Sequence, residues 1–556
     1  MTQASRTLTC VFASVMIAGL GAPDHSAAQH DHAHHDDPGM SVPGDIGTVD
    51  FRVGCDASVQ ADFDHALGLM HHMMYAQARE AFGTIIEAQP DCAMAHWGIA
   101  TTLFQPLWGT RPTPEDLQLG LGRIERAAAL GVTDEREQRL LDATAAFFRG
   151  GDETAFGERL AGWQEGMAAA YASHPEDPDI TSLYALALLS MAQAPGKDRD
   201  RLHDWAEVLL RQVWERIPEH PGAIHYSIHA TDADGRAHNA LDLVEHYATI
   251  APEVPHALHM PSHIYVRLGD WPQVIEWNER SARAALAQSP PEAISHHYIH
   301  AIDYLVYAHL QRGEDRQAAT LAEDALTAGP HQQSFISAFH HAAIPARLAV
   351  EQRDWQRAMA LEPRSPRELP WDEATWAEGL SWYAKGLGAV HAGDLGLART
   401  AEQRLGELAG RARDRGEEAF ATYLEVDRHI LDGWLHLAEN RKDEAVAQMR
   451  SAVALERTAE KHPVTPGALL PPNEALGDLL LELNRPQEAM AAYRQADTVW
   501  PGRFNTLLGA ARAAEAAGDL PRSRGYYARL LALAGDSRRE GVEEARQLLG
   551  QRAPEY

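Results

Sequence analysis

The sequence predicts an all-α protein in which helix–turn–helix units repeat along the chain as a solenoid. Two prolines, Pro218 and Pro252, each follow an amphipathic helical segment and are 34 residues apart. A small apolar residue recurs in the same register, and these residues are Ala78, Ala240, Val274, Ala318, Ala358, Ala398, Ala445 and Ala489. The 556 residues, 45 % of them hydrophobic and 23 % charged, suffice for several domains or for one long solenoid.

A period of 34 residues is that of the tetratricopeptide repeat, or TPR. Residues 473–501 fit this repeat best. Its consensus places are occupied by Leu476, Gly477, Ala489, Tyr493, Ala496 and Pro501. We therefore predict a TPR-like superhelix. The resemblance to TPR proteins implies that positions 2, 5 and 9 of the first helix in each repeat line a concave groove.

The N-terminus has the pattern of a secretory signal peptide, which we place at residues 1–28. Arg6 supplies a basic start, residues 8–22 form an apolar core, and small residues at 26–28 offer a cleavage site. The apolar core is too short to span a bilayer stably. We expect a secreted or periplasmic protein with no stable membrane span after cleavage. The alternative is a short membrane anchor.

Residues 29–50 form a His-rich segment that we expect to be disordered, because its composition cannot bury a core. Aspartates surround four histidines, and these are His30, His32, His34 and His35. Such a segment can gather divalent metal ions as an auxiliary capture site. It can equally be a solvated leader.

Two cysteines, Cys55 and Cys92, remain after removal of the predicted signal peptide, since Cys10 lies within it. Export implies an oxidising compartment. Two cysteines without a third then suggest one disulfide that ties the start of the first repeat to a following helix. The alternative is a pair of free buried thiols.

Helices begin at Cys55, and we assign residues 51–360 to an N-terminal TPR-like solenoid. Its first repeat contains the run Met-His-His-Met-Met at 70–74. His71 and His72 fall at the groove end of the first helix, which makes them candidates for auxiliary metal capture. Thioether and imidazole together suit Cu(I). The more common role of such methionines is to fill the core.

Histidines gather at helical spacing between residues 221 and 303, where the register places them on groove positions of consecutive repeats. Neighbouring first helices pack about 8–10 Å apart, so imidazoles from several repeats can converge. The predicted ligands of a metal site are His225, His229, His256, His259, His263, His300, Asp303 and His340. The carboxylates of Asp232 and Asp234 are candidates to orient these imidazoles.

Imidazole suits zinc, copper, iron and nickel, so the ligand type alone does not choose the metal. Export and the Met-His run favour copper over zinc or iron. An alternative has Pro261 start a helix, so that the residues from His259 to Ser262 form its cap and His256 and His259 lie in a turn. A second alternative is a His-lined peptide groove or a buried hydrogen-bond network without metal.

The Pro-rich, charged residues 361–370 predict a linker, and residues 371–556 predict a C-terminal TPR solenoid. This second half carries few histidines at groove positions. A protein or peptide partner is a further possible occupant of the groove. We expect no nucleic-acid partner, because the formal net charge is −30 and no basic patch is present. No Ser-His-Asp order, nucleotide motif or zinc-protease signature indicates a standard hydrolase.

Two segments, HPGAIHYSIHATD from His220 and PHALHMPSHIYVRLGDW from Pro255, resemble a widespread group of exported bacterial TPR proteins. The resemblance spans about Cys55 to Gly535. It implies the fold and the histidine set, and it assigns no reaction. We thus expect an exported TPR protein that binds a transition metal for metal handling or metal-dependent chemistry. The alternative is an interaction scaffold with structural histidines. Whether the protein is an enzyme is left open.

Overall fold

The computed structural model describes residues 44–108, 110–151, 154–193 and 197–550. In this part of the chain all the regular secondary-structure elements are helices. The first half contains α1 (Gln60–His71), α2 (Tyr75–Ala88), α3 (Ala93–Thr101), α4 (Pro114–Leu130), α5 (Glu135–Phe148), α6 (Phe156–Ser173), α7 (Pro178–Ala192), α8 (Arg199–Arg216), α9 (Pro221–Thr231), α10 (Leu241–Ile250), α11 (Pro255–His259), α12 (Pro261–Leu268) and α13 (Trp271–Ala287). The second half contains α14 (His296–Gln311), α15 (Asp315–Thr327), α16 (Phe335–Glu351), α17 (Trp355–Met359), α18 (Thr375–Ala392), α19 (Leu395–Asp414), α20 (Glu418–Ala438), α21 (Lys442–Glu456), α22 (Pro472–Glu482), α23 (Pro486–Val499), α24 (Phe504–Ala516), α25 (Leu520–Ala534) and α26 (Glu540–Leu549). Two short 3₁₀ turns, Ala57–Val59 and Ala237–Ala240, complete the set.

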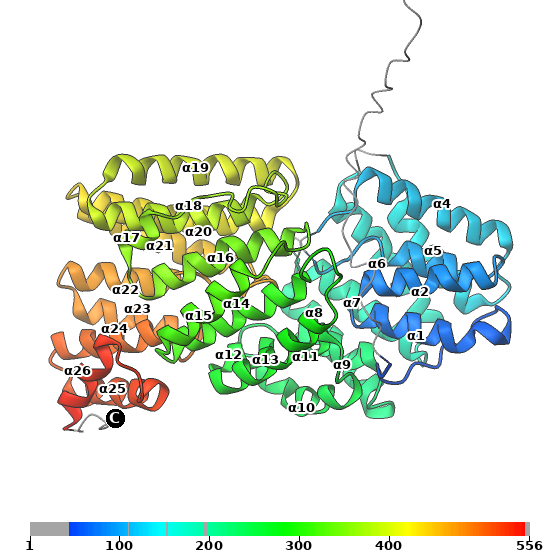
Figure 1. Cartoon of the computed structure of the whole chain (residues 1–556), viewed down its shortest axis with the longest axis horizontal. Coiled ribbons are helices and arrows are strands. Elements are labelled where there is room, and N and C mark those ends of the chain that lie inside the picture. Colours follow the sequence, from blue (N-terminus) through cyan, green and yellow to red (C-terminus); the bar gives the residue numbers. More distant parts are fainter. Residues whose placement is uncertain (1–43, 109, 152–153, 194–196, 551–556) are drawn as a thin grey trace, which may run out of the picture. The chain divides into compact units, whose positions relative to one another are not determined.

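Consecutive helices pack against each other as pairs, which can be followed in Figure 1 for α18 with α19 and α20 with α21. The first helix of each pair also contacts the first helix of the next. This chain of contacts runs through α14, α16, α18, α20, α22 and α24. The prediction of an all-α, TPR-like helix–turn–helix solenoid is therefore confirmed. Residues 1–43, which include the predicted signal peptide and most of the His-rich segment with His30, His32, His34 and His35, lie outside the described residues.

The TPR consensus residues in α22 and α23 have a visible packing role. Tyr493 lies between two glycines, Gly477 of its own pair and Gly509 of the next. A Cβ added at either glycine would come within 2.7 Å of the Tyr493 ring at Gly477 and within 2.4 Å at Gly509. The small residue in this register, Ala489, is fully buried. The repeat pattern in the sequence thus marks positions where two helices approach too closely for larger side chains.

The helical register breaks in the centre of the chain. α11 ends at His259, and Pro261 starts α12 after the single residue Met260. Proline is accommodated there because the first turn of a helix needs no N–H donor at that place. His256 and His259 therefore belong to a short helix of their own and not to a turn, which answers the alternative raised by the sequence.

The segment between Met359 and Thr375, which includes the predicted linker, contains no helix. The stack of helices nevertheless continues across it, because both α16 and α17 pack against α18. Contacts also join distant repeats, and α14 touches α24. No helix of the described residues is both long and apolar enough to cross a membrane.

Cys55 and Cys92 are joined by a disulfide, with Cα atoms 5.0 Å apart and a sequence separation of 37. The bond connects the segment before α1 to the start of α3. Replacing both cysteines with Ser should lower the free energy of unfolding by about 3–4 kcal/mol, because closing a loop of this length constrains the unfolded chain. Chemical denaturation of the two proteins measures this loss. Alkylation without reductant, followed by mass spectrometry, should find no free thiol at either position, and two alkylated cysteines would refute the disulfide.

Candidate metal centre

The predicted ligands come from five neighbouring helices whose faces turn toward the interior. His225 and His229 lie one turn apart on α9, whose residues are all buried. His256 and His259 come from α11 and His263 from α12. The remaining candidates are His300 and Asp303 on α14 and His340 on α16. All eight side chains are at most 8 % exposed, so the predicted groove positions form a closed interior site.

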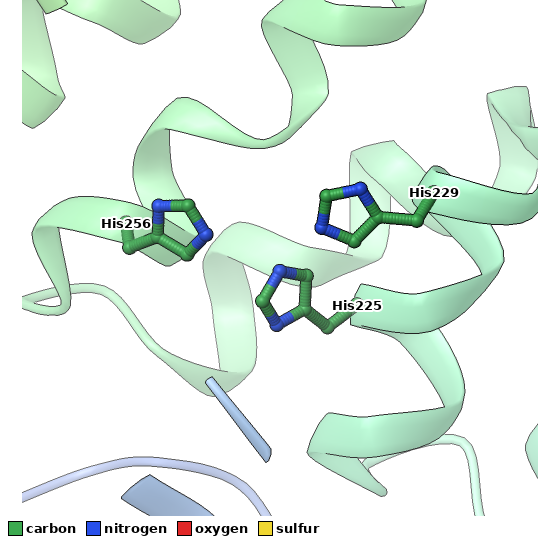
Figure 2. Close-up of side chains that lie close together, drawn as sticks. All are labelled: His225, His229 and His256. Atoms are coloured by element: carbon green, nitrogen blue, oxygen red, sulfur yellow. The ribbon is translucent and has the colours of Figure 1, made fainter. Parts of the chain in front are cut away.

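His225, His229 and His256 form a compact group that we call the first His triad. One ring nitrogen from each lies within 4.8 Å of the others, and Figure 2 shows the three rings turned toward one another from two helices. Nδ1–H of His225 donates to the carbonyl oxygen of His71 at 2.7 Å, so Nε2 carries no proton and has a free lone pair. Within the described chain, Nε2 of His225, Nε2 of His229 and both nitrogens of His256 have no hydrogen-bond partner.

This concentration of unpartnered polar atoms is costly. Leaving one buried acceptor unsatisfied costs about 1–3 kcal/mol, so three converging imidazoles need a hydrogen-bond donor or a cation between them. Neutral imidazole nitrogens are the most common metal ligands in proteins. The donor set of the first His triad therefore fits a transition metal ion.

His259, His263 and His300 form the second His triad, again with one nitrogen from each within 4.8 Å of the others. Nδ1–H of His259 donates to Oδ1 of Asn278 at 2.7 Å, and Nδ1–H of His263 donates to Asp232 at 2.9 Å. Both Nε2 atoms are then acceptors, yet they face each other at 3.0 Å. Two lone pairs at this distance need a proton or a cation between them. Two nitrogens bound to one tetrahedral zinc would be about 3.3 Å apart, which is close to the observed spacing.

His300 is oriented by a relay of buried groups. Arg347 Nε donates to Asp303 at 2.7 Å, and Nδ1–H of His340 donates to the same carboxylate at 3.1 Å. Nε2 of His340 must then accept from Nδ1–H of His300, at 2.8 Å. The relay leaves Nε2 of His300 without a proton. Asp303 and His340, predicted as ligands, thus orient His300 through hydrogen bonds, a role that carboxylates commonly have at metal sites.

The electrostatics keep the imidazoles neutral. Burial lowers the pKa of His225, His256, His259 and His300 well below the ordinary value, and it lowers the pKa of His229 to about 3. Burial opposes the charge of Asp232, but Lys461 and Arg267 hold its pKa well below the usual range. Neutral imidazole is the form that binds metal. The role suggested for Asp232 as an orienting carboxylate is confirmed, whereas Asp234 pairs with Arg267 at 2.6 Å.

The two triads lie side by side. The ring centroids of His229 and His263 are 6.0 Å apart, and those of His256 and His259 are 6.2 Å apart. Members of both triads line one cavity. The centre of a water molecule can move within about 30 Å³ of this cavity. That space holds one or two water molecules or a small ligand. Any ions bound by the two triads would therefore share one enclosed space.

Residues 457–471, between α21 and α22, cover this cavity, and we call them the covering segment. Lys461 Nζ donates to Asp232 at 2.9 Å, Tyr304 donates to the Pro463 carbonyl at 3.0 Å, and Arg347 donates to the Gly467 carbonyl at 2.8 Å. Besides the triads, the cavity is lined by Met73, Leu107, Trp108, Phe335, Ile336, His462, Pro463 and Val464. The sequence analysis did not find His462 because it lies in a loop, where no periodicity marks it. His297, which shares a helix with His300, was also missed, although its ring centroid is 5.6 Å from that of His256.

A third group, His71 with Asp179 and His220, has similar spacing but different hydrogen bonding. Both histidines place Nε2 against Asp179, at 2.9 and 3.2 Å. Nδ1 of His71 lies 3.2 Å from the Tyr226 hydroxyl, and Nδ1 of His220 accepts from a backbone N–H. Every nitrogen has a partner, so this group needs no ion.

His72 is satisfied in the same way, by the Ile46 carbonyl and the Tyr247 hydroxyl. For this reason we leave both histidines of the Met-His run, His71 and His72, out of the proposed site. Met73 of the same run does line the cavity, where its sulfur accepts from Trp108 Nε1 at 3.3 Å.

Comparisons with known proteins found solved structures of low sequence identity and low structural similarity to this chain. No protein-family model and no curated protein matches the chain. Among solved structures, the human IFIT1 dimer with m7Gppp-AAAA is 14 % identical, with 79 % of this chain and 90 % of that chain covered and a TM-score of 0.38. The Cut9–Hcn1 hetero-tetramer of the APC/C is 12 % identical (88 % and 90 % covered, TM-score 0.33), and a tetratricopeptide repeat protein from Parabacteroides merdae is 14 % identical (53 % and 99 % covered, TM-score 0.28).

At these TM-scores the similarities carry no argument about function, and the fold assignment rests on the stacked helix pairs. The molecule belongs to the class of TPR-like all-α solenoids. Its interior contains two neighbouring histidine clusters that could hold a metal ion.

Proposed function

We propose that this protein binds two transition metal ions, one in each His triad. The observation that carries the proposal is the convergence of buried, unpartnered imidazole nitrogens in the first triad. The second triad supports it, because the hydrogen bonds from Asn278, Asp232 and His340 all leave a lone pair on the opposite nitrogen. The fully paired group around Asp179 provides an internal contrast.

Copper is the favoured metal. Three imidazoles suit copper, zinc and iron alike, but a thioether from Met73 lines the same cavity, and thioether with imidazole favours copper. The predicted signal peptide and the disulfide are consistent with export to an oxidising compartment. The His-rich residues 29–40 would then serve as an auxiliary capture segment.

Three protein ligands for each ion leave a coordination position open toward the shared cavity. Sites with an open position support chemistry, whereas closed four-ligand sites serve structure. Metal-dependent chemistry is thus favoured over storage. We propose that the protein lies outside the cytoplasm and belongs to the group of exported TPR proteins that its sequence resembles. We also propose that a protein partner binds to a surface of the TPR-like solenoid. The net charge of −30 argues against a nucleic-acid partner.

Elemental analysis of the untagged mature protein lacking residues 29–40 tests the proposal. We expect about two equivalents of one transition metal, retained after mild chelation, because each triad supplies three buried ligands. Deleting the His-rich segment removes unspecific binding. No metal, and no uptake when copper, zinc or iron is added, would refute the proposal and favour the alternative function of an interaction scaffold with structural histidines.

A further inference from the structure

A second cavity lies against the covering segment and carries no member of either His triad. The centre of a water molecule can move within about 150 Å³ of this cavity, which is enough space for a small organic ligand. Its walls come from α18, α20, the end of α21, the covering segment and the end of α23. The covering segment contributes Lys461 and His462 to this cavity, and His462 also lines the cavity of the metal centre.

Asp427 on α20 is the unexplained group in this cavity. Its side chain is 9 % exposed, and within the described residues it accepts no hydrogen bond and pairs with no cation. Burial raises the pKa of Asp427 well above its ordinary value, and the neighbouring Glu456 raises it further. The hydroxyl of Tyr383, whose pKa Asp427 helps to raise, also lacks a partner in the described chain. A buried carboxyl group without a partner is costly, so it calls for a donor or a cation from outside.

Glu456 is a second acid in the same cavity. Burial raises its pKa to about 7, although a hydrogen bond from Trp500 Nε1 at 3.1 Å opposes this increase. A carboxyl group with such a pKa becomes ionised readily when a positive charge is placed beside it. Asp427 and Glu456 together therefore form a place where a cation would be stabilised by two acids.

Four basic side chains that line this cavity, Arg267, Arg347, Lys461 and Arg199, are already engaged by other groups. Arg267 donates to Asp232, Asp234 and Glu460. Arg347 donates to Asp303 and to two groups of the covering segment. Lys461 donates to Asp232, and Arg199 donates to a backbone carbonyl and lies 3.6 Å from Glu460. Arg457 lowers the pKa of Glu456, but less than burial raises it.

The remainder of the cavity is aromatic and aliphatic. Trp376, Tyr423 and Trp500 line it together with Leu380, Val426, Leu469, Leu470 and Val499. Aromatic faces attract ammonium groups, and aliphatic walls accept a hydrocarbon body. Two carboxyl groups select for N–H donors and so favour a primary ammonium over a quaternary one.

We infer that this cavity binds a small primary amine, with its ammonium group between Asp427 and Glu456 and its apolar body against Trp376, Tyr423 and Trp500. The site needs no metal ion, so it is independent of the function proposed for the His triads. Because the covering segment lines both cavities, an amine bound here would lie beside the metal centre.

Isothermal titration calorimetry of the full mature protein with 2-phenylethylamine tests the inference, with 2-phenylethanol as the neutral control of similar shape. We expect the amine to bind at least about tenfold more tightly than the alcohol, because charge-assisted hydrogen bonds are lost in the alcohol. Asp427→Asn and Glu456→Gln should each weaken amine binding by about tenfold or more, while Asp432→Asn, on the same helix but facing His436, should not.

Three outcomes would overturn the inference: equal affinities for amine and alcohol, no binding up to about 10 mM amine, or unchanged affinity in Asp427→Asn. Far-UV circular dichroism and metal content of each variant show that the protein remains folded. Titrations before and after metal removal separate the two proposals, because amine binding is expected in both states. A purified protein that holds no metal and takes none up, but binds the amine, would refute only the metal site.

Discussion

Replacing His259 and His263 together with Gln should remove one bound metal ion and leave the other. These residues supply two of the three ligands of the second triad, and a single remaining imidazole cannot hold an ion tightly. The content should fall from about two equivalents to about one. Replacing His225 and His229 with Gln should have the same effect through the first triad, and combining all four changes should abolish binding. Elemental analysis of the folded variants measures each content.

The group formed by His71, Asp179 and His220 offers a control, because it has similar spacing and burial and two of its three members are histidines. His220→Gln should leave the metal content unchanged, since the hydrogen bonds of this group already satisfy its nitrogens. Far-UV circular dichroism confirms that each variant remains helical. A wild-type metal content in the four-fold variant, or metal loss in His220→Gln, would contradict the assignment.

Arg503→Met should produce a large loss of stability. The guanidinium lies before α24 and is fully buried, and it joins three helices: it donates to Tyr307 of α14 at 2.6 Å, to Glu351 of α16 at 2.6 Å and to Glu474 of α22 at 3.0 Å. Methionine fills a similar volume but leaves two buried carboxylates short of a partner. Removing one member of a buried ion pair costs about 3–5 kcal/mol.

Urea denaturation near neutral pH measures this loss. Burial opposes the charge of Glu474, but Arg503 and Arg353 lower its pKa, so its ionised form stabilises the fold above the ordinary carboxyl pKa of about 4.3. The difference between wild type and variant should therefore shrink as the pH falls below that value. Arg512→Met is the control, because Arg512 pairs with Glu544 at 2.7 Å on the surface and should cost under about 1 kcal/mol. Equal losses in the two variants would show that the buried contacts do not hold the repeats together.

The helices were predictable because their signals are local. The 34-residue register follows from close packing between neighbours in sequence, as at Gly477 and Tyr493, and such constraints leave a periodic trace. The break at Pro261 was also visible in the sequence, since proline restricts its own backbone. The register placed His256 and His259 on one helix with His263, and the separate short helix α11 was not predicted, because five residues are too few for a periodic signal of their own.

The site was predictable in part. Groove positions in consecutive repeats identified all six histidines of the two triads, because repeat geometry converts sequence position into spatial proximity. Their division into two triads depends on ring orientations, which hydrogen bonds to Asn278, Asp232 and His340 fix. Asp303 and His340 lie at the same kind of repeat position as the triad histidines, but they orient His300 through hydrogen bonds. The spacing of residues in the sequence does not show this difference.

The sequence therefore established the helical repeat, its register and the histidines that face the interior, since these depend on residues close together in the chain. The tertiary structure established which nitrogens converge and which are already satisfied, as the contrast between His225 and His71 illustrates. It also placed His462 and Lys461 beside the two His triads and left Asp427 without a partner in its own cavity. Those arrangements join repeats that are far apart in the sequence, and non-local packing leaves no periodic pattern to be read in advance.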